Sequence, residues 1–264
     1  MKSILMCPPK YFEIIYEINP WMSTLNNIDY QKAFLQYTQL KQIYDNLKIK
    51  YNEVFPNPSL PDQVFTTDVG FAFNKIFLKA NFKYNERKKE ADIAEIHFKI
   101  NNFKIEYLPS HVFFEGGDLI KSQDNLFLGY GKRTSKEACP FIEKIFNKNV
   151  VLIKLDNPYY YHLDTLFCPL NSSVAMIYKD ALSKNESDKL SSYYKNIIEV
   201  TKQDIGIFAC NSIVSGNNIV MPFGISEKLK KQIEKYEFNV FEIEFSEYLK
   251  GGGAIHCASL EIHD

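Results

Sequence analysis

Residues 114–120 read FEGGDLI, a polar turn with two glycines that leads directly into an apolar segment. Gly and Asp are typical turn residues, and the apolar residues after them predict a β-strand. A similar turn followed by a strand-like segment returns elsewhere, so that aligned positions lie 46 to 50 residues apart. These positions are Asp68, Asp118, Asp164, Asn211 and Cys257. A regular period of this length indicates an architecture built from repeated units.

Each unit also contains a helix-like segment with apolar residues three and four positions apart, and then a short β-rich segment. The expected helices are 33–47, 86–97, 136–146, 186–198 and 226–236. The expected strands after them are 53–55, 103–108, 149–155, 197–201 and 239–245. The fifth unit ends at Asp264, so we expect the N-terminal strand 3–7 to complete it and close a ring. The pattern therefore favours an α/β ring of five units over a doubly wound sheet, with chance periodicity in another α/β protein as the alternative.

Composition excludes several classes of protein. The 264 residues contain 31 Lys and Arg against 32 Asp and Glu, and this balance argues against a nucleic-acid partner. No stretch approaches the roughly 18–20 apolar residues of a membrane helix, and Pro8, Pro9 and Lys10 interrupt any signal peptide. Five cysteines without a CxxC pair predict neither a disulfide framework nor a zinc site, and favour the cytoplasm. We expect no metal and no cofactor, and a homodimer remains compatible with the sequence.

In a ring of this kind the strand ends face one centre, so the side chains of the turns should converge. They comprise a thiol, an imidazole and four carboxylates: Cys257, His162, Asp68, Glu115, Asp118 and Asp164. A thiolate is a strong nucleophile, and histidine transfers protons near neutral pH. Paired carboxylates suit a planar cation such as a guanidinium. The set predicts attack of sulfur on a guanidinium carbon, expulsion of an amine protonated by His162, and hydrolysis of the adduct.

Each of these residues also has a purely structural interpretation. A lone cysteine is more often a buried apolar residue, but the three glycines at 251–253 before Cys257 indicate a special backbone. Asp118 follows two glycines and could cap a turn. His256 precedes Cys257, and on a strand it would point to the opposite face, which makes it the weaker candidate base. The remaining cysteines are interpreted as structural: Cys7, Cys139, Cys168 and Cys210.

Five segments in order resemble the guanidine-modifying pentein superfamily, which includes arginine deiminases, dimethylarginine dimethylaminohydrolases and amidinotransferases. They are 61–68, 115–118, 131–135, 162–165 and 251–257. The resemblance covers nearly the whole chain and implies a five-bladed propeller of ββαβ units, with residues 1–264 as a single catalytic domain. It implies that Cys257 is the nucleophile and His162 the acid and base. Asp68, Glu115 and Asp164 would bind the guanidinium, the last two as part of the catalytic set.

The same resemblance implies further contacts with the substrate. Arg133 corresponds to an arginine that binds the substrate carboxylate, and Asp62 to a residue that contacts the α-amino group. We place Asp118 with the substrate-binding residues. The segment 18–22, INPWM, resembles a bacterial branch that includes the arginine-degrading domain of cyanobacterial arginine dihydrolases. This likeness predicts Asn19 and Trp21 at the mouth of the pocket, with a place in the core beside a proline turn as the alternative for Trp21.

The predicted function is hydrolysis at the guanidino carbon of arginine or an N-substituted arginine. Amidino transfer to an amine acceptor shares the covalent intermediate and stays open, as does arginine dihydrolysis to ornithine. The dihydrolases resembled here have Asn where this chain has Asp68, and the dimethylarginine hydrolases have Glu and Asp in place of Thr67 and Gly252. These differences favour deiminase-type hydrolysis over ornithine formation. An alternative from another class is a propeller that only binds, without catalysis.

Overall fold

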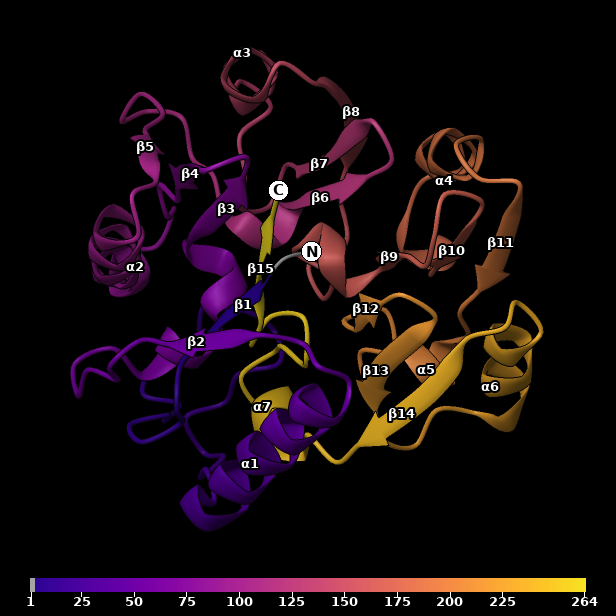
Figure 1. Ribbon diagram of the computed structural model, residues 1–264, viewed down its shortest axis with the longest axis horizontal. Helices are drawn as coiled ribbons and strands as arrows, with labels where there is room; N and C mark the ends of the chain where they lie inside the picture. The colour runs from indigo at the N-terminus through magenta and orange to yellow at the C-terminus, as the bar shows by residue number, and fades with distance from the viewer. Residues whose placement is uncertain (1–2) are drawn as a thin grey trace.

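The computed structural model describes residues 3–264 and shows five blades around a central axis, with helices at the rim (Figure 1). The first strands of the blades are β3 (Gly70–Phe73), β6 (Leu119–Ser122), β9 (Phe167–Pro169), β12 (Ile213–Ser215) and β15 (Leu260–His263). The second strands are β4 (Ile76–Lys79), β7 (Asn125–Tyr130), β10 (Val174–Ile177), β13 (Asn218–Pro222) and β1 (Ser3–Met6). The third strands are β5 (Lys104–Glu106), β8 (Asn149–Lys154), β11 (Asn196–Glu199), β14 (Asn239–Ile243) and β2 (Tyr51–Glu53). The helices between second and third strands are α2 (Lys88–Ile100), α3 (Ala138–Phe146), α4 (Lys184–Ser191), α6 (Glu227–Glu234) and α1 (Tyr30–Asn46).

Every blade has the same hydrogen-bond pattern. The first and second strands are antiparallel, and the second and third are parallel, as a helical crossover between them requires. In the fifth blade the N-terminal β1 pairs with the C-terminal β15, with Ser3 opposite Ile262. β15 also pairs in parallel with β3 of the first blade. The predicted five-bladed ββαβ ring, closed by the N-terminal strand, is therefore confirmed.

One predicted helix is too long. The helix expected over 186–198 ends at Ser191, and Asn196–Glu199 forms β11 instead. In β11, Ile197 and Ile198 pair with Ala175 and Met176 of β10. These β-branched residues are more stable in the sheet than in an extension of the helix, so pairing with β10 overrides the helical periodicity of the sequence.

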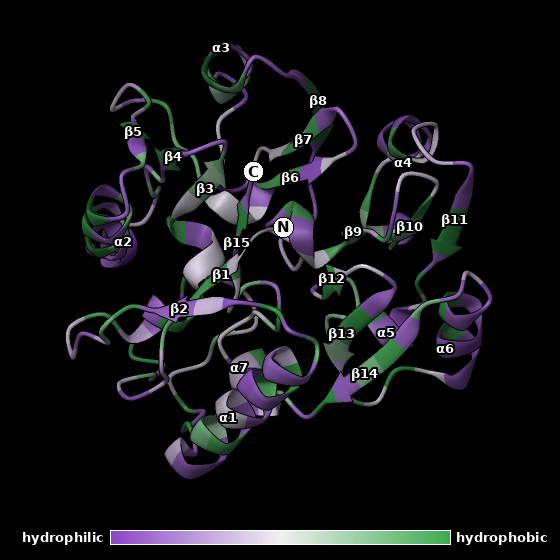
Figure 2. Ribbon diagram, in the orientation of Figure 1, coloured by the Kyte–Doolittle hydropathy of each residue, from purple (hydrophilic) through white to green (hydrophobic). Residues whose placement is uncertain are grey.

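Apolar residues recur in the strands and helices, as the green segments of the ribbon in Figure 2 show, and their buried side chains form the hydrophobic core clusters. In the first blade Phe98 of α2 stacks on Phe77 of β4, with ring centroids 4.0 Å apart. In the fifth, the buried Tyr44 of α1 donates to or accepts from Ser259, with 2.8 Å between the hydroxyl oxygens. These contacts fix the blades, so that the turns at their inner ends are held in place. Within residues 3–264, no helix is both long and apolar enough to cross a membrane.

Candidate active site

Three short 3₁₀ turns meet at the axis: η2 (Thr66–Val69), η4 (Gly116–Asp118) and η5 (Leu163–Thr165). The glycines of η4 make this approach feasible. A Cβ on Gly116 would lie 2.1 Å from the carbonyl oxygen of Thr67, and one on Gly117 would lie 2.8 Å from an oxygen of Asp68. Any side chain here would separate the first blade from the second. The FEGGDLI segment therefore brings the carboxylates of two blades together.

Cys257 is fully buried and lies in a turn before β15. Its Sγ accepts a hydrogen bond from Asn211 Nδ2 at 3.1 Å and is 3.4 Å from Asp164 Oδ2. The Asn211 Oδ1 in turn accepts from the backbone N–H groups of Ala254 and Cys257, each at 3.0 Å. Burial, together with Asp164 and Asp68, raises the pKa of the Cys257 thiol. The thiol is thus held at one position and kept protonated by burial and by the neighbouring carboxylates.

Asn211 is a site residue that sequence reasoning missed. It was aligned with the four other turn positions, and this alignment was the available signal, yet no chemical role was assigned to it. The structure shows that its amide bridges Cys257 and the backbone carbonyl oxygen of Asp164. Because all its polar atoms are used, Asn211 orients the nucleophile.

His162 is fully buried between two carboxylates. Its Nε2 is 2.9 Å from Glu115 Oε2, and its Nδ1 is 3.3 Å from Asp68 Oδ1. Burial acts to lower the pKa of His162, but Asp68, Asp118 and Glu115 outweigh it and raise the pKa to about 9. Burial likewise acts to raise the pKa of Glu115, but Arg133 and His162 lower it to about 2. His162 is therefore an imidazolium at neutral pH, with a proton available for a leaving group.

Arg87 was also missed by the sequence analysis. It is buried and donates from Nη1 to Asp68 Oδ2 at 2.5 Å. Its Nε and Nη2 both donate to Glu90 Oε2, at 3.1 and 2.7 Å. Its guanidinium lies 4.9 Å from the ring of Phe82. The signal in the sequence was Arg87 and Glu90 three positions apart at the start of a helix, which is a spacing that permits an ion pair. Arg87 supplies the positive charge that Asp68 needs in a buried position.

Asp62 and Asp118 are buried carboxylates at the edge of the site. Burial raises the pKa of Asp62 to about 6 and that of Asp118 to about 7, in each case against nearby cations. One oxygen of Asp118 accepts the backbone N–H of Leu163 at 3.1 Å, which ties η4 to η5. Asp118 thus has a clear structural contact in addition to its predicted place near the substrate.

Arg133, predicted to bind the substrate carboxylate, and Asn19, predicted to lie at the mouth of the site, line one cavity. The Arg133 guanidinium lies between the rings of Tyr84 and Tyr161, 4.6 and 4.5 Å from their centroids, and donates to Glu115 Oε2 at 3.0 Å. Asn19 donates from Nδ2 to the Gly251 carbonyl oxygen and accepts from the backbone N–H of Trp21. Both line a cavity of about 320 Å³ that also contains Lys83, Lys132 and Tyr161. Trp21 is not among the residues that line this cavity: its ring packs against the core, 4.5 Å from the centroid of Phe208, and its indole N–H donates to the Tyr159 carbonyl oxygen.

Several buried polar atoms at the hub have no hydrogen-bond partner. Within residues 3–264 eight such side-chain atoms occur, and five of them belong to the site. They are Asp62 Oδ1, Asp68 Oδ1, Asp118 Oδ2, Asp164 Oδ1 and His162 Nδ1. Asp68 Oδ1 and His162 Nδ1 lie 3.3 Å apart as an ion pair without a hydrogen bond between them. A buried acceptor without a hydrogen bond is costly, so these carboxylate oxygens together indicate a ligand that donates several hydrogen bonds. In the same part of the chain, no group of three His, Cys, Asp or Glu side chains is arranged to hold a metal ion.

A ββαβ propeller of five blades with a cysteine, a histidine and carboxylates at its hub defines the guanidine-modifying pentein class. Within this class, the chain belongs to the dimethylarginine dimethylaminohydrolase family. A family model described as N,N dimethylarginine dimethylhydrolase, eukaryotic, matches residues 9–264.

Individual relatives agree with this assignment. An N(G),N(G)-dimethylarginine dimethylaminohydrolase of Mycobacterium tuberculosis is 32% identical over 261 residues, which cover 98% of this chain and 85% of that protein. The bifunctional arginine dihydrolase/ornithine cyclodeaminase ArgZ of Synechocystis sp. is 34% identical over 266 residues, covering 98% of this chain but 37% of ArgZ. The crystal structure of the N-terminal domain of a cyanobacterial ArgZ variant bound to substrate superposes with a TM-score of 0.95. It is 31% identical and covers 99% of this chain, which matches 98% of that domain.

Proposed function

We propose that the chain is a cysteine-dependent hydrolase that acts on the guanidino carbon of arginine or an N-substituted arginine. The products are citrulline and ammonia or an alkylamine. The observation that carries this proposal is the group of unpaired carboxylate oxygens beside the thiol of Cys257. Residues 1–264 act together as one catalytic domain, because all five blades contribute to the hub.

The charge of the substrate activates the nucleophile. A guanidinium donates to the free oxygens of Asp68 and Asp164, so its positive charge offsets the two anions that raise the pKa of Cys257. With substrate bound, the thiol releases its proton more easily than without it, and the proton goes to solvent because His162 is already protonated and cannot accept it. The empty enzyme accordingly keeps a protonated thiol, and the thiolate forms beside the carbon that it attacks.

His162 transfers the remaining protons. The Cys257 sulfur adds to the guanidinium carbon, and the tetrahedral adduct expels its amine as His162 donates a proton to the leaving nitrogen. The neutral imidazole, still held by Glu115, then takes a proton from a water molecule that attacks the same carbon. The second adduct collapses, releasing citrulline and restoring the cysteine. One water is consumed and one amine is released in each turnover.

The mouth of the site suits the amino-acid end of the substrate. Lys83, Lys132 and Arg133 line it, and cations of this kind pair with an α-carboxylate. Asp62 keeps one oxygen free and supports contact with an α-amino group. In the present structure Arg133 is paired with Glu115 and with the Ile18 carbonyl oxygen, so a carboxylate would have to share this cation.

A second candidate reaction is dihydrolysis of arginine to ornithine, which is favoured by the likeness to the N-terminal domain of ArgZ, an arginine dihydrolase. Here Asp68 is held in an ion pair with Arg87. A negative side chain at this position favours a cationic guanidinium over the neutral ureido group of citrulline, so we expect the reaction to stop at citrulline. A binding module without catalysis has no use for the ordered thiol of Cys257.

The test is incubation of the protein with arginine, monomethylarginine and asymmetric dimethylarginine, with mass spectrometry of the products. We expect citrulline and little ornithine from the wild type, and no product from Cys257→Ala. Cys139→Ala, in helix α3 of the second blade, is the matched control and should retain full activity. Absence of turnover with all three guanidines, or activity that survives in Cys257→Ala, would overturn the proposal. Added glycine or ornithine as amine acceptors distinguishes amidino transfer from hydrolysis.

A further inference from the structure

His256, next to the nucleophile, shares a carboxylate oxygen with it. The Asp164 Oδ2 is 2.8 Å from His256 Nδ1 and 3.4 Å from Cys257 Sγ. The strand alternation expected for residues 256 and 257 is wrong, because residues 255–258 form a turn that precedes β15. Two consecutive side chains can therefore reach the same carboxylate from different directions. His256 is thus linked to the thiol by a single atom.

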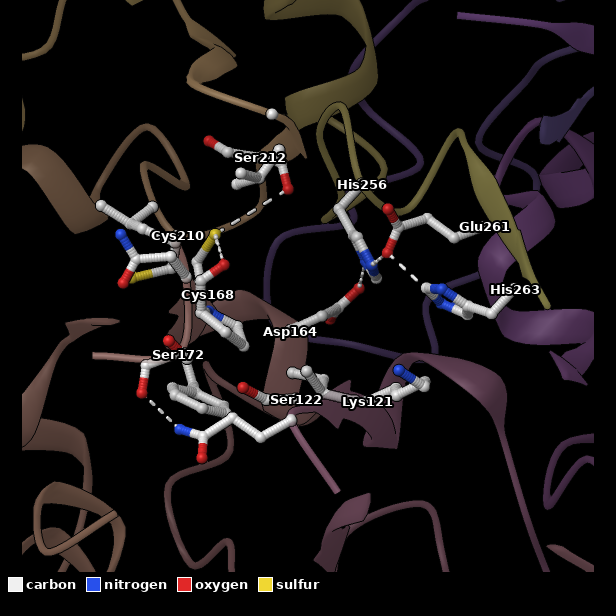
Figure 3. Close-up of a pocket in the computed structure, with 18 residues that line it drawn as sticks. Lys121, Ser122, Asp164, Cys168, Ser172, Cys210, Ser212, His256, Glu261 and His263 are labelled. Carbon is white, nitrogen blue, oxygen red and sulfur yellow. Dashed lines mark hydrogen bonds and ion pairs between the residues drawn. The ribbon is translucent and has the colours of Figure 1, made fainter. Parts of the chain in front are cut away.

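His256 faces a second cavity, shown in Figure 3. This cavity has a volume of about 340 Å³ and is lined by Asp164 and His256 together with Lys121, Glu261 and His263. It shares no lining residue with the cavity at the mouth of the site. Cys257, His162 and Glu115 line neither of them. The second cavity therefore borders Asp164 and His256 without involving any residue that lines the cavity beside Arg133 and Asn19.

The charges around His256 favour its protonated form. Its Nε2 is 3.8 Å from Glu261 Oε2, and the same oxygen is 3.7 Å from His263 Nε2. Burial acts to lower the pKa of His256, but the contacts with Asp164 and Glu261 raise it to about 10. Burial lowers the pKa of His263 to about 4, so His263 is neutral. Lys121 is the other cation at this cavity, and no ion pair joins it to Asp164 among the interactions of residues 3–264.

On the basis of the proposed function, we propose that His256 is a positioning residue for the reaction. Its imidazolium holds Asp164 so that Oδ2 faces the Cys257 sulfur and Oδ1 stays free for the guanidinium. It also offsets the negative charge beside the sulfur, which favours the thiolate. His256 does not touch the substrate and acts only through Asp164, from the second cavity.

Removal of His256 has a defined physical consequence. Asp164 is buried, and without the imidazolium it would keep a negative charge next to the thiol that only the bound guanidinium could offset. The pKa of Cys257 would rise, and the carboxylate could rotate away from its position between sulfur and substrate. Both effects slow the formation of the covalent adduct, whereas the contacts of the amino-acid end at the mouth remain intact.

The experiment compares the wild type with His256→Ala, His256→Gln and, as control, His111→Ala, which changes an exposed loop residue. In His256→Ala we expect kcat for arginine to fall 10- to 100-fold with KM changed less than threefold. The rising limb of the kcat/KM–pH profile should move to higher pH. His256→Gln keeps a donor but no charge, so it should recover part of kcat without restoring the pH profile.

Added imidazole gives a second readout. It should enter the space left in His256→Ala from the second cavity and restore kcat in a saturable way, without competing with arginine. An unchanged kcat and pH profile in His256→Ala, or rescue that competes with arginine, overturns the inference. A failure of the proposed function is distinguishable, because then the wild type turns over no guanidine at all. If His256→Ala does not fold by circular dichroism, His256→Gln decides by its pH profile.

Discussion

The two ends of the hub contain the same kind of side chain in different surroundings. At the substrate end, His162 is completely buried between Asp68 and Glu115. At the other end, His256 is held by Asp164 near Glu261, but its side chain keeps 15% of its exposure and borders the second cavity. Both histidines are protonated because nearby carboxylates outweigh burial: Asp68, Asp118 and Glu115 for His162, and Asp164 and Glu261 for His256. The two histidines differ in their position: His162 Nδ1 is one of the buried hub atoms without a hydrogen-bond partner, so in the proposed reaction His162 and not His256 exchanges protons with the substrate.

The largest expected effect is a difference in kcat between variants of the two histidines. Asparagine keeps a hydrogen-bonding side chain at either position but cannot donate a titrating proton. His162→Asn should lower kcat by roughly 10²- to 10⁴-fold, the usual contribution of a general acid–base group. His256→Asn should lose much less, because it removes an orienting charge and not the proton donor. Steady-state kinetics with arginine at pH 7 measures both, with circular dichroism to confirm folding. Equal losses in the two variants would mean that the two ends of the hub do not differ in function.

A smaller effect concerns stability as a function of pH. The pKa of both histidines is raised in the folded state, so the stabilisation they provide is full below the unfolded value of about 6.5. It is lost as pH rises through about 9 for His162 and about 10 for His256. The shifts correspond to a contribution on the order of 3 to 5 kcal/mol for each group. In urea unfolding at pH 6 and pH 10, the free energy of unfolding of the wild type should exceed that of His162→Asn and of His256→Asn by less at pH 10 than at pH 6.

The two histidines should lose their stabilising contribution over different pH ranges. Near pH 9.5 the contribution of His162 should be mostly lost while part of that of His256 remains. His111→Ala, at an exposed histidine, should track the wild type at every pH. A difference between wild type and His162→Asn that stays constant from pH 6 to pH 10 would show that His162 does not gain a proton on folding.

The sequence was sufficient for the fold because the period of the turns reflects the repeated blade. Asp68, Asp118, Asp164, Asn211 and Cys257 could be aligned without any structure. All five occur at the inner end of a blade, just before or within the turn that enters a first strand. Helix ends were less predictable. The end of α4 at Ser191 depends on the pairing of β11 with β10, a contact between segments that local periodicity does not describe.

The site was predicted only in part, for a related reason. For cysteine, histidine and carboxylates at the hub turns, the residue type alone indicates a catalytic or binding role. Arg87 and Asn211 do not, since an arginine at the start of a helix and an asparagine in a turn are common surface residues. Their roles come from burial: Arg87 is paired with Asp68, and Asn211 holds Cys257. Asn19 was expected at the pocket mouth through resemblance, and its contacts with the backbone of the glycine segment are visible only in three dimensions.

The smallest expected effect tests the mouth of the site against the second cavity. Asn19 accepts backbone N–H groups of Trp21 and Met22 and donates to Gly251, so it joins the segment 18–22 to the glycines before Cys257. Gly252 has φ +86, and a Cβ there would lie 2.7 Å from the Asn19 side chain, which shows how closely the two segments approach.

Asn19→Ala removes the hydrogen bonds that Asn19 makes, worth about 1 kcal/mol each in net terms. KM for arginine should rise about two- to tenfold while kcat stays within twofold, because the mouth binds the amino-acid end and the reacting groups do not move. Asn26→Ala, at an exposed position of the same N-terminal segment, is the control and should change neither constant. If Asn19→Ala instead lowers kcat and shifts the pH profile, as His256→Ala is expected to do, then Asn19 at the mouth and His256 at the second cavity both act on Cys257.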